Sequence, residues 1–272
     1  MNIIQDGTDG FGHQLQGLFT SLIFHNVLNY YFDGYEFIKK PFRFEHVNSE
    51  EAPRLQEYLK KSVEAFIEDF NPVRRNYKSI VRAHEIWKIP ITPCQETLYS
   101  LDNVFFFHKL FPNYEPQLLL NVERMKPYFI NEQLPQSRLN EKNIVIHARM
   151  GDAITTGRGH SIHNYNQQIV QLIPILKKQY PDHQYYIHSD GVVPSILSAI
   201  GDNFSFFGKN TPVLEILSDI IHAKIFIEGN SSLSKVASFI GNQELIITHD
   251  DNDHSHPNKN YMPISQILSQ FN

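Results

Sequence analysis

The sequence predicts an α/β protein whose second half folds as a doubly wound parallel sheet. Short β-branched runs alternate in this half with amphipathic stretches that are long enough for helices. The first run, Asn143–Ile146, is continuous and apolar, as expected of a strand buried on both faces. Regular alternation of strand and helix indicates parallel strands joined by right-handed crossovers. We therefore expect a Rossmann-like domain here.

The elements expected in this half begin with a strand, and strands and helices then alternate. The expected ranges are, in order, 143–149, 163–179, 184–188, 193–200, 203–207, 211–222, 224–228, 231–240, 244–248 and 262–270. In the first helix the apolar residues recur at helical spacing and define the face expected to be buried. These residues are Ile169, Leu172, Ile173 and Leu176.

The first half has fewer clear signals. Residues 1–5 resemble a strand, 12–30 an apolar helix and 51–69 an amphipathic helix. The segment 71–134 is aromatic and interrupted by prolines, and we expect several helices and few strands in it. Pro135 interrupts a polar stretch and predicts a linker, so the expected domains are 1–135 and 136–272.

Composition limits the function classes. The chain has 272 residues, of which 41% are hydrophobic and 19% charged, as in globular proteins. A net charge of −5 without a long basic run argues against nucleic acid as the partner. The single cysteine, Cys94, excludes an internal disulfide framework. The sequence contains no long apolar run typical of a transmembrane segment, and its start lacks signal-peptide features, so a cytoplasmic location is expected.

A glycine-rich segment, Asp6–Gln14, lies between the first expected strand and helix. Gly10 and Gly12 permit a tight turn, and the N–H groups of the following helix favour an anion. The spacing departs from the dinucleotide-binding fingerprint. An ordinary strand-to-helix turn is the alternative interpretation.

The most informative motif is His147–Asp152, at the end of the first strand of the second half. Ligands of open α/β sheets bind beyond the carboxyl ends of the strands. The Arg149 guanidinium offers a planar fork of donors that suits a diphosphate, and His147 lies on the same strand face. The alternative is a structural ion pair between Arg149 and Asp152.

Two further strand ends are polar. Ser189 and Asp190 follow the strand at 184–188, and Asp190 could accept a hydrogen bond from a base or a ribose hydroxyl. Ser231 and Ser232 begin a helix, where they could donate to a phosphate. Helix capping is the alternative for both pairs. Together, the successive polar strand ends predict a nucleotide site.

The segment Thr248–His256 contains many groups able to bind metals, and Asp251-Asn252-Asp253 has the DxD form. We favour a solvated loop here, and expect no metal at the active site. Neither a serine-hydrolase elbow nor a Walker P-loop is present in the sequence.

The order of these motifs resembles the fucosyltransferase superfamily, which includes α-1,2-, α-1,6-, nodulation and protein O-fucosyltransferases. The shared blocks are Gly-x-Gly-His-Gln-Leu from residue 10, His-x-Arg-x-Gly-Asp from residue 147, Ser-Asp from residue 189 and Asn-Ser-Ser-x-Ser from residue 230. The similarity extends from residue 7 to about residue 241 and is thin between 30 and 140.

The resemblance implies a GT-B-like fold, with two Rossmann-like domains that face each other across a cleft. It implies an enzyme of glycan biosynthesis, an inverting glycosyltransferase that needs neither metal nor cofactor. The C-terminal domain would bind the nucleotide-sugar donor, GDP-fucose. The N-terminal domain would hold most of the glycan acceptor, whose hydroxyl receives the fucose.

The resemblance also implies roles for individual residues. Arg149 would hold the β-phosphate and neutralise the charge on the leaving GDP, and Asp152 would brace Arg149 or orient the fucose. His147 would approach the guanine or ribose, and Asp190 would recognise the guanine edge. Backbone amides at Gly10–Gln14 would donate to the phosphates. The residues implied in donor binding are Gly10, Gly12, His13, Gln14, His147, Ser189, Asp190, Asn230, Ser231, Ser232 and Ser234.

Two departures from the family pattern matter. Many relatives have a second arginine where this chain has Met150, and the span 153–181 lacks the acidic residue that serves the α-1,6 type as a base. The loop 153–162 carries Arg158 and His160 instead and could close over the donor. The remaining candidates for the base are Asp9, His13, Asp152 and His160.

These departures leave alternatives open. The donor could be another nucleotide sugar, such as UDP-xylose. The chain could instead be a non-catalytic homologue that binds a nucleotide sugar or a glycan. A metal hydrolase built on the 250–256 cluster is a third alternative, which insensitivity to chelation would exclude.

Overall fold

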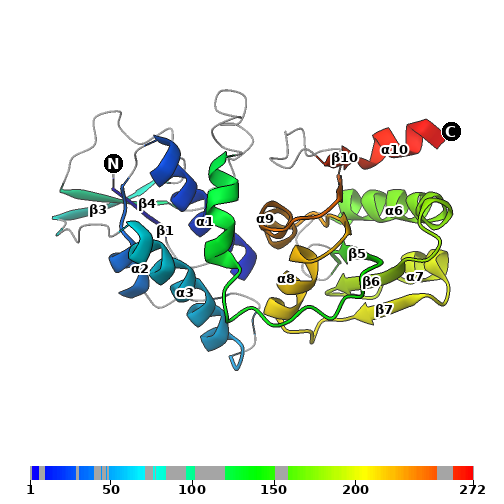
Figure 1. Cartoon of the computed structure of the whole chain (residues 1–272), viewed down its shortest axis with the longest axis horizontal. Helices are drawn as coiled ribbons and strands as arrows, with labels where there is room; N and C mark the ends of the chain where they lie inside the picture. Colours follow the sequence, from blue (N-terminus) through cyan, green and yellow to red (C-terminus); the bar gives the residue numbers. More distant parts are fainter. Residues whose placement is uncertain are drawn as a thin grey trace. The chain divides into compact units, whose positions relative to one another are not determined.

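The computed structural model forms two compact units, Met1–Leu134 and Pro135–Asn272, which are described separately (Figure 1). Its described residues are 2–5, 10–28, 31–39, 44, 47, 49–70, 76, 78–83, 96–101, 120–150, 159–249 and 260–271.

The N-terminal unit contains a sheet of four parallel strands in the order β2-β1-β4-β3. The strands are β1 (Asn2–Gln5), β2 (Tyr31–Phe32), β3 (Ser79–Ala83) and β4 (Thr97–Leu101). Strands β3 and β4 lie in the segment where the sequence predicted mainly helices, and both were missed. The sequence of this segment shows no regular alternation of strand and helix, the pattern that indicated even shorter strands in the C-terminal unit. Strand β2 and the following helix at Gly34–Lys39 were not predicted either.

Its helices are α1 (Phe11–Leu28), α2 (Gly34–Lys39), α3 (Ala52–Phe70) and a further helix at 120–129. The helices expected at 12–30 and 51–69 are confirmed, with ends that differ by one or two residues. The two helices differ in how many of their sides are buried. Helix α1 buries residues around most of its circumference, whereas α3 buries a single stripe that includes Leu55, Leu59, Val63 and Phe66.

The C-terminal unit contains a six-stranded sheet in the order β10-β9-β8-β5-β6-β7, and all of its strand pairs are parallel. The strands are β5 (Asn143–Ala148), β6 (Gln184–Ser189), β7 (Phe204–Phe207), β8 (Ile225–Ile227), β9 (Leu245–Thr248) and β10 (Tyr261–Pro263). The expected parallel doubly wound sheet is confirmed. The sequence did not predict β10, which is three residues long, lies at the sheet edge and ends in a proline.

Five helices connect or follow these strands, and all were predicted. They are α6 (Gly159–Gln179), α7 (Pro194–Ile200), α8 (Val213–Ile221), α9 (Ser232–Ile240) and α10 (Ile264–Phe271). Helices α6, α7 and α10 cover one face of the sheet and contribute to one apolar cluster. Helices α8 and α9 pack against each other on the other face (Figure 1).

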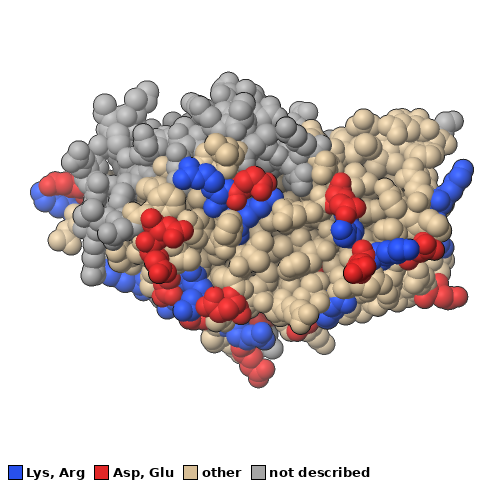
Figure 2. Space-filling model, in the orientation of Figure 1, with Lys and Arg blue, Asp and Glu red and all other residues tan. Residues whose placement is uncertain are grey.

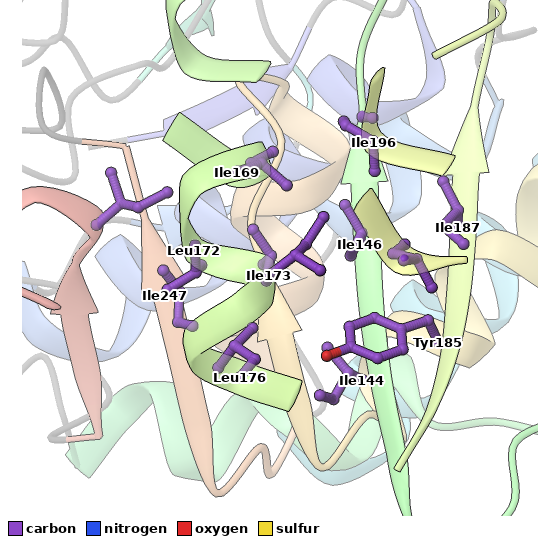
Figure 3. Close-up of a cluster of buried hydrophobic side chains, with 14 of the residues drawn as sticks. Ile144, Ile146, Ile169, Leu172, Ile173, Leu176, Tyr185, Ile187, Ile196 and Ile247 are labelled. Carbon is purple, nitrogen blue, oxygen red and sulfur yellow. The ribbon is translucent and has the colours of Figure 1, made fainter. Parts of the chain in front are cut away.

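The apolar cluster confirms the buried face predicted for α6. Figure 3 shows the α6 side chains directed at the sheet, where they meet isoleucines of β5 and β6 and Ile196 of α7. The α6 members are Ile169, Leu172, Ile173 and Leu176, each at most 1% exposed. Since β5 residues Ile144 and Ile146 point to this face, the alternation of a strand directs Val145 and His147 to the α8–α9 face.

Charged side chains of both signs lie close together on the face shown in Figure 2. The ion pairs of the described residues include Lys224 with Glu244 at 2.5 Å and Lys126 with Glu123 at 2.7 Å. Within the described part of the chain, no helix has both the length and the apolar character needed to cross a membrane.

Candidate functional site

The C-terminal sheet changes direction between β5 and β8. The chain builds β5, β6 and β7 outward on one side, then returns to add β8, β9 and β10 on the other. The strand order is thus 3-2-1-4-5-6 when the unit's strands are counted from β5. The connections leave in opposite directions at this point, and in open α/β sheets such a switch point, beyond the carboxyl ends of the two strands, is where a ligand crevice forms. This is where an open α/β sheet binds its ligand.

Arg149 lies directly after β5 and reaches across to the loop after β8. Its Nη1 donates to the backbone carbonyl of Asn230 at 3.3 Å. The side chain is partly exposed, whereas Asn230 is exposed. The contact places a guanidinium beside the start of α9, on the line where the two halves of the sheet meet. The structure thus brings Arg149, the predicted catalytic residue, into contact with Asn230 of the predicted donor-binding set.

The N-terminus of α9 begins with a serine cap. Ser231 is the N-cap, and its Oγ accepts a hydrogen bond from the Ser234 amide at 3.1 Å. For Ser231 the structure therefore shows the capping alternative. Ser232 and Leu233 are the first two residues of the helix, and their backbone N–H groups have no hydrogen-bond acceptor within it. Those two amides and the helix dipole make this end of α9 suited to an anion, with the Ser232 hydroxyl beside them.

His147 is hydrogen-bonded on the α9 side. Its Nδ1 contacts the Ser234 hydroxyl, and the Ser231 Oγ lies 3.4 Å from the same nitrogen. Burial, together with the neighbouring His188 and Arg149, lowers the pKa of His147 to about 3. The ring is therefore neutral at physiological pH. With a pKa this low, His147 would be a weak proton acceptor in catalysis.

Gly229 allows β5 and the loop after β8 to approach closely. A Cβ at this position would lie 2.3 Å from the carbonyl oxygen of His147 and 2.9 Å from its Nδ1. Any side chain would push these atoms apart, so a residue without a Cβ is required here for steric reasons. This glycine, directly before the Asn-Ser-Ser-x-Ser block, thus allows the close approach of two backbone segments.

Asp190 joins the ends of β5 and β6. Its Oδ1 accepts a hydrogen bond from the Met150 amide at 2.6 Å, and the carboxylate is exposed. Ser189 is buried, and its Oγ accepts from the Gly191 amide at 3.2 Å. The alternative interpretation, capping of the next helix by either residue, is wrong, since Val193 is the N-cap of α7.

Helix α6 is tied to the same sheet edge at two points. The Tyr165 hydroxyl donates to the backbone carbonyl of Glu228, and the Asn166 amide Nδ2 lies 3.1 Å from the Met150 sulfur. Met150 directly follows Arg149, beyond the end of β5. Its partly buried side chain packs against the apolar cluster under α6.

Glu228 was not among the predicted site residues. It directly follows β8, is 2% exposed, and its Oε2 has no hydrogen-bond partner among the described residues. Burial raises the pKa of Glu228 to about 7, against a smaller lowering effect of Lys235. A carboxyl group that gains or loses a proton near neutral pH is thus present at this sheet edge. The only indication of Glu228 in the sequence was that an acidic residue directly follows the apolar run Ile225–Ile227.

The glycine-rich segment belongs to the N-terminal unit. Gly10 directly precedes α1, and its carbonyl accepts from the amides of His13 at 3.0 Å and Gln14 at 3.2 Å. These two amides form the first turn of the helix, which leaves those of Phe11 and Gly12 as possible anion donors. The Gln14 side chain is buried.

Several predicted residues lie outside the described residues. They are Asp9, Cys94, Asp152, Arg158 and the 250–256 cluster with its DxD sequence. His160 falls in α6, but its side chain is not described. Across the part of the chain that is described, no group of three or more His, Cys, Asp or Glu side chains is arranged to hold a metal ion.

Comparison of the sequence with protein-family models and with curated proteins gives no match.

Proposed function

We propose that this protein is an inverting, metal-independent glycosyltransferase that transfers fucose from GDP-fucose to a hydroxyl of a glycan. The proposal is carried by one observation: Arg149 is hydrogen-bonded to Asn230 beside the N-terminus of α9, at the switch point of a parallel doubly wound sheet. A guanidinium and open helix amides in one crevice form a site for a diphosphate.

The proposed reaction is a single displacement at C1 of the fucose, with GDP as the leaving group. The acceptor oxygen attacks C1 of the fucose as the bond from C1 to the β-phosphate oxygen breaks, and the electron pair of that bond leaves with GDP. The Arg149 guanidinium and the amides at the start of α9 stabilise the negative charge that develops on the β-phosphate. The proton of the acceptor hydroxyl passes to a carboxylate or imidazole of the site, or to water.

We assign the nucleotide to the C-terminal unit and the acceptor mainly to the N-terminal unit, in a GT-B-like arrangement with a cleft between them. The exposed carboxylate of Asp190 is the proposed partner of the guanine edge, because guanine offers two N–H donors and uracil only one. Asp190 Oδ2 and the second lone pair of Oδ1 remain to accept them.

A thermal-shift panel tests the proposal directly. The full chain is heated with GDP, UDP, ADP, GDP-fucose, GDP-mannose or UDP-xylose, each with and without EDTA. A ligand that binds only the folded state raises the Tm according to its occupancy. We expect stabilisation by GDP and GDP-fucose that EDTA does not change.

The other outcomes separate the alternatives. Stabilisation by UDP species would keep the transferase class and overturn the donor. A shift with Mn²⁺ that EDTA abolishes would favour a metal site at 250–256. Binding of GDP-fucose without transfer to any acceptor in a glycan array would favour the non-catalytic homologue, and no shift with any nucleotide would contradict the proposal.

A further inference from the structure

A chain of hydroxyl groups runs from the cap of α9 to the ring of His147. The Ser231 Oγ donates to the Ser234 Oγ at 3.1 Å, and the same Ser231 oxygen accepts from the Ser234 amide. The Ser234 hydroxyl in turn contacts Nδ1 of His147. Ser234 is fully buried, so this contact lies out of reach of water. The three side chains come from β5 and α9, which meet at the switch point.

The direction of the protons along this chain fixes the tautomer of the ring. Because Ser231 donates its only hydroxyl proton to Ser234, the Ser234 oxygen is already an acceptor and has its own proton to place. His147 Nδ1 is the acceptor for that proton among the described contacts of Ser234. A protonated Nδ1 would leave the buried Ser234 hydroxyl proton without an acceptor, which is costly. In the neutral ring, the proton then belongs to Nε2.

We propose that Ser234 is a positioning residue of this site, which holds His147 in the neutral tautomer that carries its proton on Nε2. His147 is partly exposed, two residues before Arg149 at the end of β5, and in this tautomer its Nε2–H can donate to a ligand but cannot accept from one. The group recognised there is therefore a hydrogen-bond acceptor, such as a ribose, phosphate or carbonyl oxygen. This consequence rests on the proposed function, whereas the tautomer itself does not.

Nitrogen NMR of the full chain tests the tautomer without any ligand. Long-range proton–nitrogen spectra of ¹⁵N-histidine-labelled protein distinguish a protonated from an unprotonated ring nitrogen. The His147 signal is identified by its absence in His147→Gln. We expect an unprotonated Nδ1 and a protonated Nε2 between pH 5 and pH 8. A protonated Nδ1, or an imidazolium in this range, would overturn the proposal.

Substitutions then test the part played by Ser234. Ser234→Ala removes the donor to Nδ1, and we expect a mixture of His147 tautomers, whereas Ser234→Thr keeps the hydroxyl and should restore the single one. Ser238→Ala is the matched control, because Ser238 is equally buried on α9 but donates to the Lys235 carbonyl at 2.8 Å. An unchanged His147 tautomer in folded Ser234→Ala would contradict the positioning role.

GDP binding shows whether the tautomer matters to a ligand. Ser234→Ala is expected to raise the Kd for GDP about three- to tenfold, as for one lost or misdirected hydrogen bond, and Ser238→Ala to leave it unchanged. If GDP does not bind the wild-type protein, the proposed function fails while the NMR result still decides the tautomer. Equal Kd values for the wild type and Ser234→Ala would overturn the link to the ligand.

Discussion

Arg138 binds Asp219 through three hydrogen bonds, although the two residues are 81 positions apart in the sequence. The Arg138 backbone amide, Nε and Nη2 donate to the Asp219 carboxylate at 3.1, 3.1 and 2.6 Å. His188 Nε2 lies 3.2 Å from the same carboxylate, and the Ser137 hydroxyl donates to it at 3.1 Å. The start of the C-terminal unit is thus held to α8 and, through His188, to β6, the strand that directly precedes Asp190.

Removal of this carboxylate should destabilise the C-terminal unit strongly. Burial raises the pKa of Asp219, but hydrogen bonds from His188 and Arg138 outweigh burial and hold the pKa below its ordinary value. Asp219→Ala would leave the Arg138 guanidinium without its buried partner, and we expect a loss of about 3–5 kcal/mol in the free energy of unfolding. Urea titration followed by circular dichroism measures this. Glu215→Gln is the control, because among the described residues this partly exposed carboxylate pairs with Arg138 Nη1 alone, and equal losses in the two variants would contradict the prediction.

Gly229→Ala should disrupt the site through the backbone. The new methyl would overlap the carbonyl of His147, and the forced separation of β5 from the start of α9 should cost about 1–3 kcal/mol in stability. It should also weaken GDP binding, since Arg149 and Asn230 would move apart. Gly208→Ala offers a comparison in the same unit, because the nearest atom to its Cβ is a Phe206 ring carbon at 3.4 Å. Similar Tm values for both variants would refute the steric argument.

Glu228 gives the stability of the protein a pH dependence of known sign. The pKa of Glu228 is about 7 in the folded protein and 4.5 as an ordinary glutamate, so the folded state holds more protons between these values. Its contribution to stability should therefore fall as the pH rises from about 4.5 to about 7, by up to about 3 kcal/mol, and stay level above. Glu228→Gln should remove this slope and raise the Tm at pH 8. The exposed Glu141→Gln should leave the slope in place, and an identical Tm profile for wild type and Glu228→Gln would contradict the assignment.

Asp190→Ala should weaken the binding of GDP more than that of UDP, by about tenfold in the ratio of Kd values, because guanine presents one more donor to the carboxylate. Isothermal titration with both nucleotides measures the ratio. Asp190→Asn separates the two roles of the residue, since the amide oxygen can still accept from Met150 while the charge is lost. Equal weakening of both nucleotides would show that Asp190 does not read the base.

Arg149→Ala should lower kcat about 10²–10³-fold, the effect of removing one donor that stabilises the transition-state charge. Arg149→Lys should recover part of the loss, because a lysine keeps the charge but cannot donate to Asn230 and a phosphate with the same fork. Steady-state transfer from GDP-fucose measures the rates. Activity within threefold of the wild type would remove Arg149 from the mechanism.

The sequence predicted the elements of the C-terminal unit well because their signals are local. Each predicted strand is a short run rich in β-branched or aromatic residues, and the apolar period of a helix is clearest on the α6 face. Polar residues at strand ends likewise indicated the edge that carries Arg149 and Asp190. Strands β2, β3, β4 and β10 and helix α2 were missed because no regular alternation of strand and helix marked them in the sequence, whereas this alternation indicated strands as short as the three residues of β8.

The rest of the site depends on contacts between distant parts of the chain. A serine at a helix start can cap the helix or bind a phosphate, and the sequence could not decide between these for Ser231. The contacts of Arg149 with Asn230 and of His147 with Ser234 require β8 to pair with β5, and no local pattern encodes that pairing. The burial that shifts the pKa of Glu228 is equally a property of the assembled sheet.

The order of the strands divides the candidate site between two successive pieces of chain. A break at the exposed turn of Lys209 and Asn210 would leave Arg149 and Asp190 on one fragment and Asn230 on the other. Neither fragment alone would hold both the guanidinium and the start of α9. During synthesis, the edge of β5 must likewise wait for its partner until β8 has left the ribosome. Binding of a ligand to a mixture of the two fragments would therefore show that they have reassociated, as in a split-protein reporter.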